Sequence, residues 1–127
     1  MSKVFDPANF GKIAKEIVEN VESNAVFREN REAFLRTAIS RAYYSAFLLV
    51  REKMRLEVGI VSKSPEVHRE VMDWVYKKFG EKKYQMLLNL RFMRNDADYE
   101  LEKSVDINDA KLAVELFRRI VGNLDSA

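Results

Sequence analysis

The chain has 127 residues, of which 47% are apolar and 33% are charged, with four glycines, two prolines and no cysteine. A chain of this length buries enough apolar surface for one compact core, so we expect a single domain over residues 1–127. The absence of cysteine excludes disulfides and thiolate metal sites within the chain. The 22 basic and 20 acidic residues give a formal charge of +2, which neither requires nor excludes a nucleic-acid partner.

No segment approaches the roughly 20 consecutive apolar residues of a membrane-spanning helix. Residues 1–10 lack the basic and then apolar pattern of a signal peptide. We therefore expect a cytoplasmic protein without membrane attachment.

Apolar residues recur at helical spacing almost throughout, and glycine and proline are too few for the turns of a β fold. The first predicted helix begins at Asp6-Pro7, an N-cap followed by proline at the first helical position, and ends near Ser23-Asn24. Its apolar stripe consists of Phe10, Ile13, Ala14, Ile17 and Val21.

The second predicted helix is the longest, beginning at Val26 or Asn30 and ending at Glu57. Its apolar residues cover more than one face, which predicts a central, buried position. A third helix begins after Ser64-Pro65 and ends at Gly80.

A fourth helix begins at Glu81, and its apolar pattern is interrupted by the polar residues 94–99. A last amphipathic helix follows Asp106 and Asp109, whose spacing is typical of a capping box. Together these helices predict an all-α, antiparallel helical bundle with short connections.

Several kinds of catalytic site are absent from the sequence. It contains no glycine-rich phosphate loop and no Gly-x-Ser-x-Gly elbow, and its single histidine, His68, cannot form a histidine metal cluster. The acidic residues also lack the Glu-x-x-His pairs of di-metal bundles. The sequence therefore predicts neither a metal nor another cofactor.

Residues 94–102 are the most informative segment for function. If the fourth helix continues through them, Arg94 and Asp98 lie four residues apart on one face. Arg94 can grip a phosphate with two nitrogens, and Asn95 can orient it or contact a ribose hydroxyl. Asp96, Asp98 and Tyr99 add two carboxylates and a phenol. The alternative is a solvated helix end with a weak salt bridge, and the residues alone leave both interpretations open.

A second cluster spans residues 36–47 on the long helix. Ala38, Ala42 and Ala46 recur at helical spacing and allow a close helix approach, and we expect Tyr43 and Phe47 to pack in the core. Arg36 and Arg41 also lie on this largely apolar helix. At least one of them must lie near the edge of the buried face, where an arginine needs a carboxylate or a phosphate.

The sequence resembles the small free-standing HEPN proteins at residues 40–47 (SRAYYSAF) and 94–99 (RNDADY), with His68 on a helix between them. The likeness extends from about Glu32 onward. The resemblance implies an up-and-down bundle of four main helices plus a shorter one, and a homodimer with a cleft between protomers. It also implies genomic pairing with a minimal nucleotidyltransferase, often as a toxin–antitoxin module, and metal-independent RNA cleavage in active members.

Active members of this family carry an arginine, a polar residue and then a histidine four to six residues after the arginine. Arg94 and Asn95 match the first two positions, whereas Tyr99 occupies the histidine position. Tyrosine, with an unperturbed pKa near 10, is a poor base at neutral pH, so we predict weak or absent nuclease activity. His68 is the alternative source of the missing imidazole, acting across the dimer cleft, although a lone histidine on a helix is more often a structural or surface residue.

Three hypotheses follow. The first is a dimeric module that binds RNA, a nucleotide or the partner protein through Arg94, Asp96, Asp98 and the nearby Arg41. The second is a ribonuclease toxin that uses Arg94 with Tyr99 or His68 as proton carriers. In the third, Arg41 pairs with Asp96 or Asp98 and only pins the fourth helix to the second. Dimerisation is predicted from apolar residues left outside one core: Leu48, Trp74 and Phe92.

Overall fold

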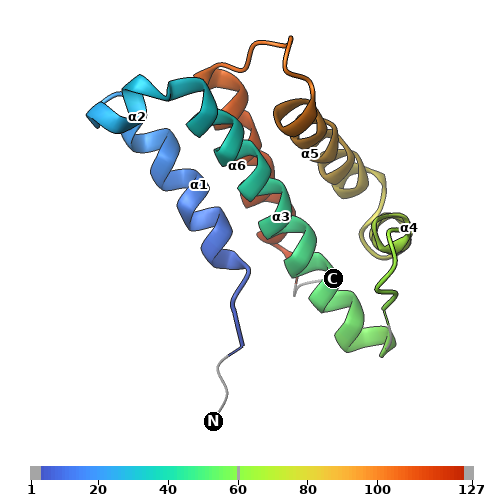
Figure 1. Ribbon diagram of the computed structural model, residues 1–127. Coiled ribbons are helices and arrows are strands. Elements are labelled where there is room, and N and C mark those ends of the chain that lie inside the picture. Colours follow the sequence, from blue (N-terminus) through green and yellow to red (C-terminus); the bar gives the residue numbers. More distant parts are fainter. Residues whose placement is uncertain (1–3, 60, 125–127) are drawn as a thin grey trace.

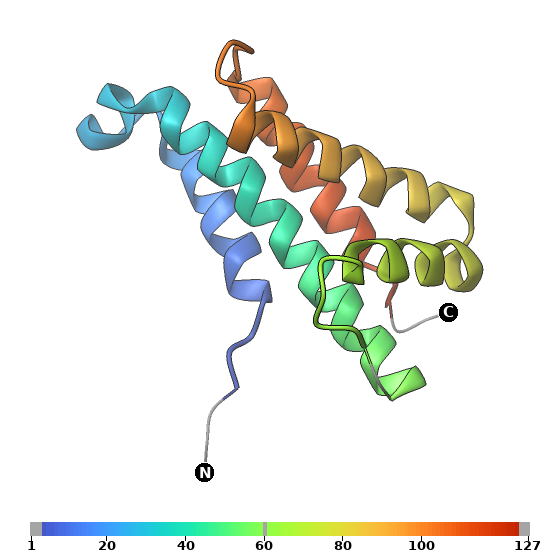
Figure 2. The same ribbon diagram turned by 45° about the vertical axis from the view of Figure 1, so that its right-hand side comes forward.

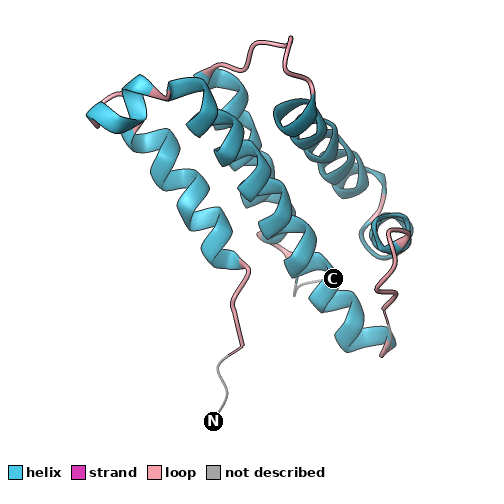
Figure 3. Cartoon of the chain, viewed as in Figure 1, coloured by secondary structure: helices cyan, strands magenta, loops and turns pink. Residues whose placement is uncertain are grey.

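The computed structural model describes residues 4–59 and 61–124. All regular structure among these residues is helical, with no strand (Figure 3). The prediction of an all-α bundle is confirmed. The six helices are α1 (Ala8–Asn20), α2 (Ala25–Glu29), α3 (Arg31–Val58), α4 (Val67–Phe79), α5 (Glu81–Tyr99) and α6 (Ile107–Val121).

The long helix α3 occupies the centre of the fold and contacts each of the other five helices (Figure 1). Helices α1 and α5 run antiparallel to it on two sides, and α6 packs behind it against both of them. Residues from nearly every turn of α3 are buried, including Leu35, Ala42 and Val50. The prediction of a central second helix is confirmed.

Helix α4 departs from the up-and-down pattern. It is seen end-on in Figure 1, where the other long helices run obliquely, and Figure 2 shows it beside the first turns of α5. Gly80, with φ of 94°, links α4 directly to α5, a conformation that residues with a Cβ rarely adopt. This placement brings the start of α4 against α3, and with it His68.

The first helix has the predicted cap, because Asp6 Oδ1 accepts a hydrogen bond from Ala8 N at 3.0 Å. Three members of its apolar stripe are buried, Ala14, Ile17 and Val21. Ile13, which we expected in that stripe, is 50% exposed, because it lies at the edge of the arc that the other residues define.

Gly11 allows α1 and α6 to approach closely, a feature that the apolar pattern does not reveal. A Cβ atom at this position would lie 2.3 Å from the ring of Phe117, so any larger residue would displace that ring. The packing of α1 on α6 therefore depends on this glycine.

The predicted second helix is interrupted at Asn30, and both of its expected starting points mark real helix starts. Asn24 caps the short α2 by accepting from Val26 N at 2.9 Å. The carbonyl oxygen of Val26 then accepts from both the backbone N–H of Asn30, at 3.2 Å, and the side chain of Asn30, at 3.0 Å, which stabilises the end of α2. The core role of Tyr43 and Phe47 is confirmed, since they are 1% and 3% exposed.

The last helix starts with the predicted capping box. Asp106 Oδ1 accepts from Asp109 N, and Asp109 Oδ2 accepts from Asp106 N, each at 3.0 Å. In the part of the chain that the structure describes, no helix has both the length and the apolarity needed to cross a membrane.

Two of the three apolar residues expected outside the core belong partly to it. Leu48 on α3 and Trp74 on α4 are half-buried and pack against the core. Phe92 on α5 is 56% exposed and remains on the surface.

Candidate functional site

Helix α5 continues to Tyr99, so the polar segment of residues 94–99 is helical. Arg94 and Asp98 consequently share a face, as the spacing predicts. The distance between Arg94 Nη1 and Asp98 Oδ2 is 3.9 Å, which is long for an ion pair with direct hydrogen bonds.

Arg36 on α3 closes the C-terminal end of α5. Its Nη1 donates to the carbonyl oxygens of Asp96, Ala97 and Glu100 at 3.2, 3.0 and 3.3 Å, and its Nη2 donates to that of Lys103. Its Nε donates to Glu32 at 2.9 Å. Arg36 thus finds the predicted carboxylate on its own helix, but most of its donors serve carbonyl groups, which carry partial negative charge at a helix C-terminus.

Arg94 is 7% exposed and surrounded by aromatic rings. Its guanidinium carbon lies 5.2 Å from the ring centroids of Tyr43 and Tyr44 and 5.9 Å from that of Tyr99. Its buried Nε has no hydrogen-bond partner among the described residues. Arg94 is therefore a desolvated cation whose hydrogen-bonding capacity is only partly used, an arrangement that costs stability unless another group completes it.

His68 lies close to this arginine within the same chain. The hydroxyl oxygen of Tyr43 is 2.7 Å from His68 Nδ1, and the imidazole stacks on Phe47 with a centroid separation of 4.3 Å. Tyr43 therefore contacts Arg94 with its ring and His68 with its hydroxyl. The sequence suggested a catalytic role for His68 only across a dimer cleft, because it does not reveal the angle at which α4 crosses α3.

Burial and positive charge shift the pKa values of both groups in this pair. Burial raises the pKa of Tyr43 to about 12, and Arg91 and Arg94 oppose part of that rise. Burial also lowers the pKa of His68, and the charges of Arg91, Arg94 and Arg51 lower it further. At neutral pH the tyrosine is protonated and the imidazole is neutral.

Arg41 on α3 also contacts the ring of Tyr44. Its guanidinium carbon is 5.2 Å from the Tyr44 ring and 4.8 Å from that of Phe10, and its Nη2 donates to Ser40 Oγ at 3.4 Å. Ser40 in turn donates to Asp98 Oδ2 at 3.2 Å. The predicted ion pair between Arg41 and a carboxylate of α5 is wrong for the described residues, because Ser40 takes the place of Arg41 beside Asp98.

An open cavity of about 500 Å³ lies at this position, and Arg36, Arg41 and Asp98 line it together with Ala33, Thr37, Ser40, Ala97 and Leu101. Of the other candidate residues, Tyr99 is 69% exposed and Asn95 is half-buried. Asp96 pairs with Lys103 at 3.2 Å. The structure thus brings Arg41, Arg94, Asp98 and Tyr99 together, whereas Asp96 forms an ion pair with Lys103 instead.

No group of three or more histidine, aspartate or glutamate side chains with metal-binding geometry occurs in residues 4–59 and 61–124. The polar groups near Arg94 in the described structure are guanidinium and hydroxyl groups, together with the carboxylate of Asp98 at 3.9 Å. The guanidinium and hydroxyl groups suit an oxyanion.

Fold and site together define a small all-helical protein with a buried arginine of α5 packed against aromatic rings of α3. The chain is 31% identical over 131 aligned residues to Uncharacterized protein MJ0628 of Methanocaldococcus jannaschii, an alignment that covers 91% of this chain and 75% of that protein. The chain belongs to the same family as this archaeal protein. No family model matches the chain, and no solved structure matches it.

Proposed function

We propose that this protein is a HEPN-like module that binds RNA through a phosphate site centred on Arg94. One observation carries the proposal: the guanidinium is buried, its ion pair with Asp98 is long, and its Nε lacks a hydrogen-bond partner in the described structure. A phosphate oxygen would complete this hydrogen bonding, and removal from water strengthens the attraction between the two charges.

The charges around the site favour an anion. Arg51, Arg91 and Arg94 act on His68, whereas Asp98 is the carboxylate paired with Arg94. Arg41 lines the adjoining cavity and adds a further positive charge. This excess of cations over carboxylates attracts the phosphate backbone of a nucleic acid.

The aromatic residues favour a single-stranded RNA. Tyr99 is largely exposed at the end of α5, and an exposed ring offers a face on which an unpaired base stacks. Because Tyr99 is the exposed member of the three rings around Arg94, we expect it to rotate away when phosphate enters. Asn95, one residue from Arg94, supplies an amide for the ribose hydroxyl.

Cleavage of the bound RNA should be weak or absent. Tyr99 stands where active HEPN nucleases carry a histidine, and the phenol of a tyrosine is a poorer general base than an imidazole. The protein would then hold RNA, while a minimal nucleotidyltransferase, the partner that the resemblance implies, would act beside it in a toxin–antitoxin module.

One observation favours an alternative function, a metal-independent ribonuclease. His68 is joined to the Arg94 site through Tyr43, and its lowered pKa leaves it able to accept a proton at neutral pH. In the tautomer in which Nδ1 donates to the Tyr43 hydroxyl, Nε2 has a free lone pair for the ribose hydroxyl proton. Arg94 would stabilise the phosphate charge in the transition state.

The test measures binding and cleavage of single-stranded RNA side by side. Under the proposal, wild-type protein binds RNA without cutting it, and Arg94→Gln lowers the affinity tenfold or more. Arg28→Gln, which removes the same charge from the exposed face of α2, should change the affinity less than twofold. A chelator is present throughout, so that any contaminating metal-dependent nuclease is inactive.

Three results would decide against parts of this assignment. Equal losses in Arg94→Gln and Arg28→Gln would mean that RNA responds only to net charge, which contradicts a specific site. Cleavage that disappears in both Arg94→Gln and His68→Gln would establish the ribonuclease instead. Unchanged RNA affinity in Arg94→Gln would refute both functions.

A further inference from the structure

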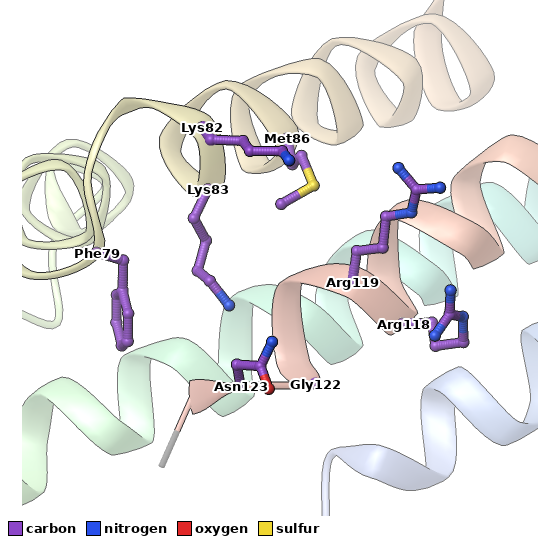
Figure 4. Close-up of a pocket in the computed structure, with 8 residues that line it drawn as sticks. All are labelled: Phe79, Lys82, Lys83, Met86, Arg118, Arg119, Gly122 and Asn123. Atoms are coloured by element: carbon purple, nitrogen blue, oxygen red, sulfur yellow. The ribbon is translucent and has the colours of Figure 1, made fainter. Parts of the chain in front are cut away.

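A second basic site lies at the beginning of α5, more than two helical turns from Arg94. A cavity of about 530 Å³ opens there between the first turn of α5 and the end of α6 (Figure 4). Lys82 and Lys83 line it from α5, and Arg118 and Arg119 line it from α6. Four cationic side chains from two helices therefore surround one cavity.

Lys83 is the most constrained of these cations. It is half-buried, its Nζ donates to the carbonyl oxygen of Ile120 at 2.7 Å, and it lies 5.2 Å from the ring centroid of Phe79. Burial lowers its pKa. No carboxylate of residues 4–59 or 61–124 lies within ion-pair distance of its Nζ, so its charge is held near the cavity without an acidic partner.

The two arginines share one carboxylate. Arg118 Nε donates to Glu115 Oε2 at 3.0 Å, and Arg119 Nε donates to Glu115 Oε1 at 2.9 Å. These hydrogen bonds lower the pKa of Glu115 to about 2, so it carries one negative charge against the four positive ones. Figure 4 shows the guanidinium of Arg119 turned toward α5, with its outer nitrogens directed away from its own helix.

We propose that this cavity binds a small ligand carrying two or more phosphate groups. The excess positive charge requires an anion of multiple charge, and guanidinium and ammonium groups are the usual phosphate partners in proteins. The volume falls within the range of small-ligand sites, and Phe79 and Met86 provide an apolar wall beside the charges. This site is independent of the RNA site proposed at Arg94.

The only tryptophan of the chain provides a direct readout. Trp74 makes an edge-on contact with Phe79, with ring centroids 5.5 Å apart, and Phe79 lines the cavity. Titration with pyrophosphate should change the Trp74 fluorescence in a saturable way. Sulfate at the same ionic strength should bind at least tenfold more weakly, and calorimetry measures both affinities without a fluorophore.

Two double variants that remove equal positive charge distinguish specific binding in the cavity from general electrostatic attraction. Lys82→Gln with Arg119→Gln should weaken pyrophosphate binding tenfold or more. Arg69→Gln with Lys111→Gln removes the same two charges from exposed positions outside the cavity and should change the affinity less than twofold. Circular dichroism of both double variants, with the same helix content as wild type, shows that folding is intact.

Further binding measurements identify the ligand and distinguish the two proposed sites. ATP that binds at least threefold more tightly than pyrophosphate identifies a nucleotide site, and equal affinities identify a site for the phosphate groups alone. Arg94→Gln should leave the pyrophosphate-induced change in Trp74 fluorescence unchanged, because Trp74 contacts the cavity residue Phe79 and reports on this site alone. The proposal is overturned if pyrophosphate binds no better than sulfate, if both double variants lose affinity equally, or if the cavity variant loses RNA affinity while keeping that for pyrophosphate.

Discussion

Arg94 combines a full positive charge with almost complete removal from solvent, and its surroundings are mainly aromatic. A residue that serves the fold alone usually has its hydrogen bonds completed within the fold. Here the buried Nε is left without a partner among the described residues, and the proposed phosphate site rests on this unused donor.

The first prediction concerns stability. Arg94→Met should leave the free energy of unfolding unchanged or raise it by about 1–2 kcal/mol, because methionine fills similar space without a buried unpaired donor. Asp98 is partly exposed, so its carboxylate remains solvated after the change. Urea denaturation measures the difference. A loss of about 3 kcal/mol or more would instead show that Arg94 belongs to a structural ion pair.

The second prediction concerns pH. The pKa of His68 is lower in the folded chain than its ordinary value of 6.5, mainly through burial. The folded state therefore binds fewer protons than the unfolded state as the pH falls below 6.5, and stability declines over that window until the folded pKa is passed. His68→Gln should remove this component, so the stability of wild type should fall more steeply than that of the variant.

A pH series of urea denaturation curves tests this expectation. The groups that act on His68 are the Tyr43 hydroxyl, the Phe47 ring and the positive charges of Arg51, Arg91 and Arg94, and all of them are retained in His68→Gln. Parallel curves for wild type and His68→Gln would contradict the assigned shift.

Among the secondary-structure elements, α3 acts as the scaffold of the site. It supplies Tyr43 and Tyr44 to Arg94, Arg41 to the adjoining cavity, and Arg36 to the end of α5. The position of Arg94 therefore depends on how firmly α5 is held along α3.

The third prediction tests that connection. Arg36→Met removes the hydrogen bonds to the carbonyl groups at the end of α5 and should lower the free energy of unfolding by about 2–3 kcal/mol. Amide exchange of Glu100, whose N–H donates to the carbonyl oxygen of Asp96, should accelerate. Arg55→Met, which breaks an exposed pair with Glu52, should change stability little.

Helix limits follow closely from local signals in the sequence. The caps at Asp6 and Asp106 and the glycine at position 80 mark real helix ends, because capping is decided by neighbouring residues. The continuation of α5 through residues 94–99 is different. Its polar sequence gives no apolar stripe, and the helix end is stabilised by Arg36, about 60 residues away in the chain.

For the whole molecule, the exposed apolar surface near the site is the feature that supports a dimer. Phe92, Tyr99 and Leu101, on α5 and directly after it, are 56%, 69% and 81% exposed. A monomer leaves these large side chains in water, whereas a second copy would cover them and place two Arg94 sites on either side of one cleft.

The fourth prediction follows from this surface. Wild-type protein should sediment as a dimer at micromolar concentration, and Phe92→Glu should shift it to the 14.9 kDa monomer by placing a charge in the interface. Leu112→Glu is a matched control, because Leu112 has a similar exposure of 52% and belongs to α6 rather than to α5. A wild-type protein that stays monomeric throughout would contradict the shared cleft.

The sequence by itself determined the all-helical class, the helix ends at Asp6, Gly80 and Asp106, and the central position of α3, because helical periodicity and capping are set by residues a few positions apart. Only the tertiary structure decided that α4 crosses α3 and brings His68 to Tyr43, that Arg36 binds the end of α5, and that lysines and arginines from two helices surround one cavity. These arrangements depend on crossing angles and side-chain packing between segments distant in the chain, which no local pattern of residues encodes.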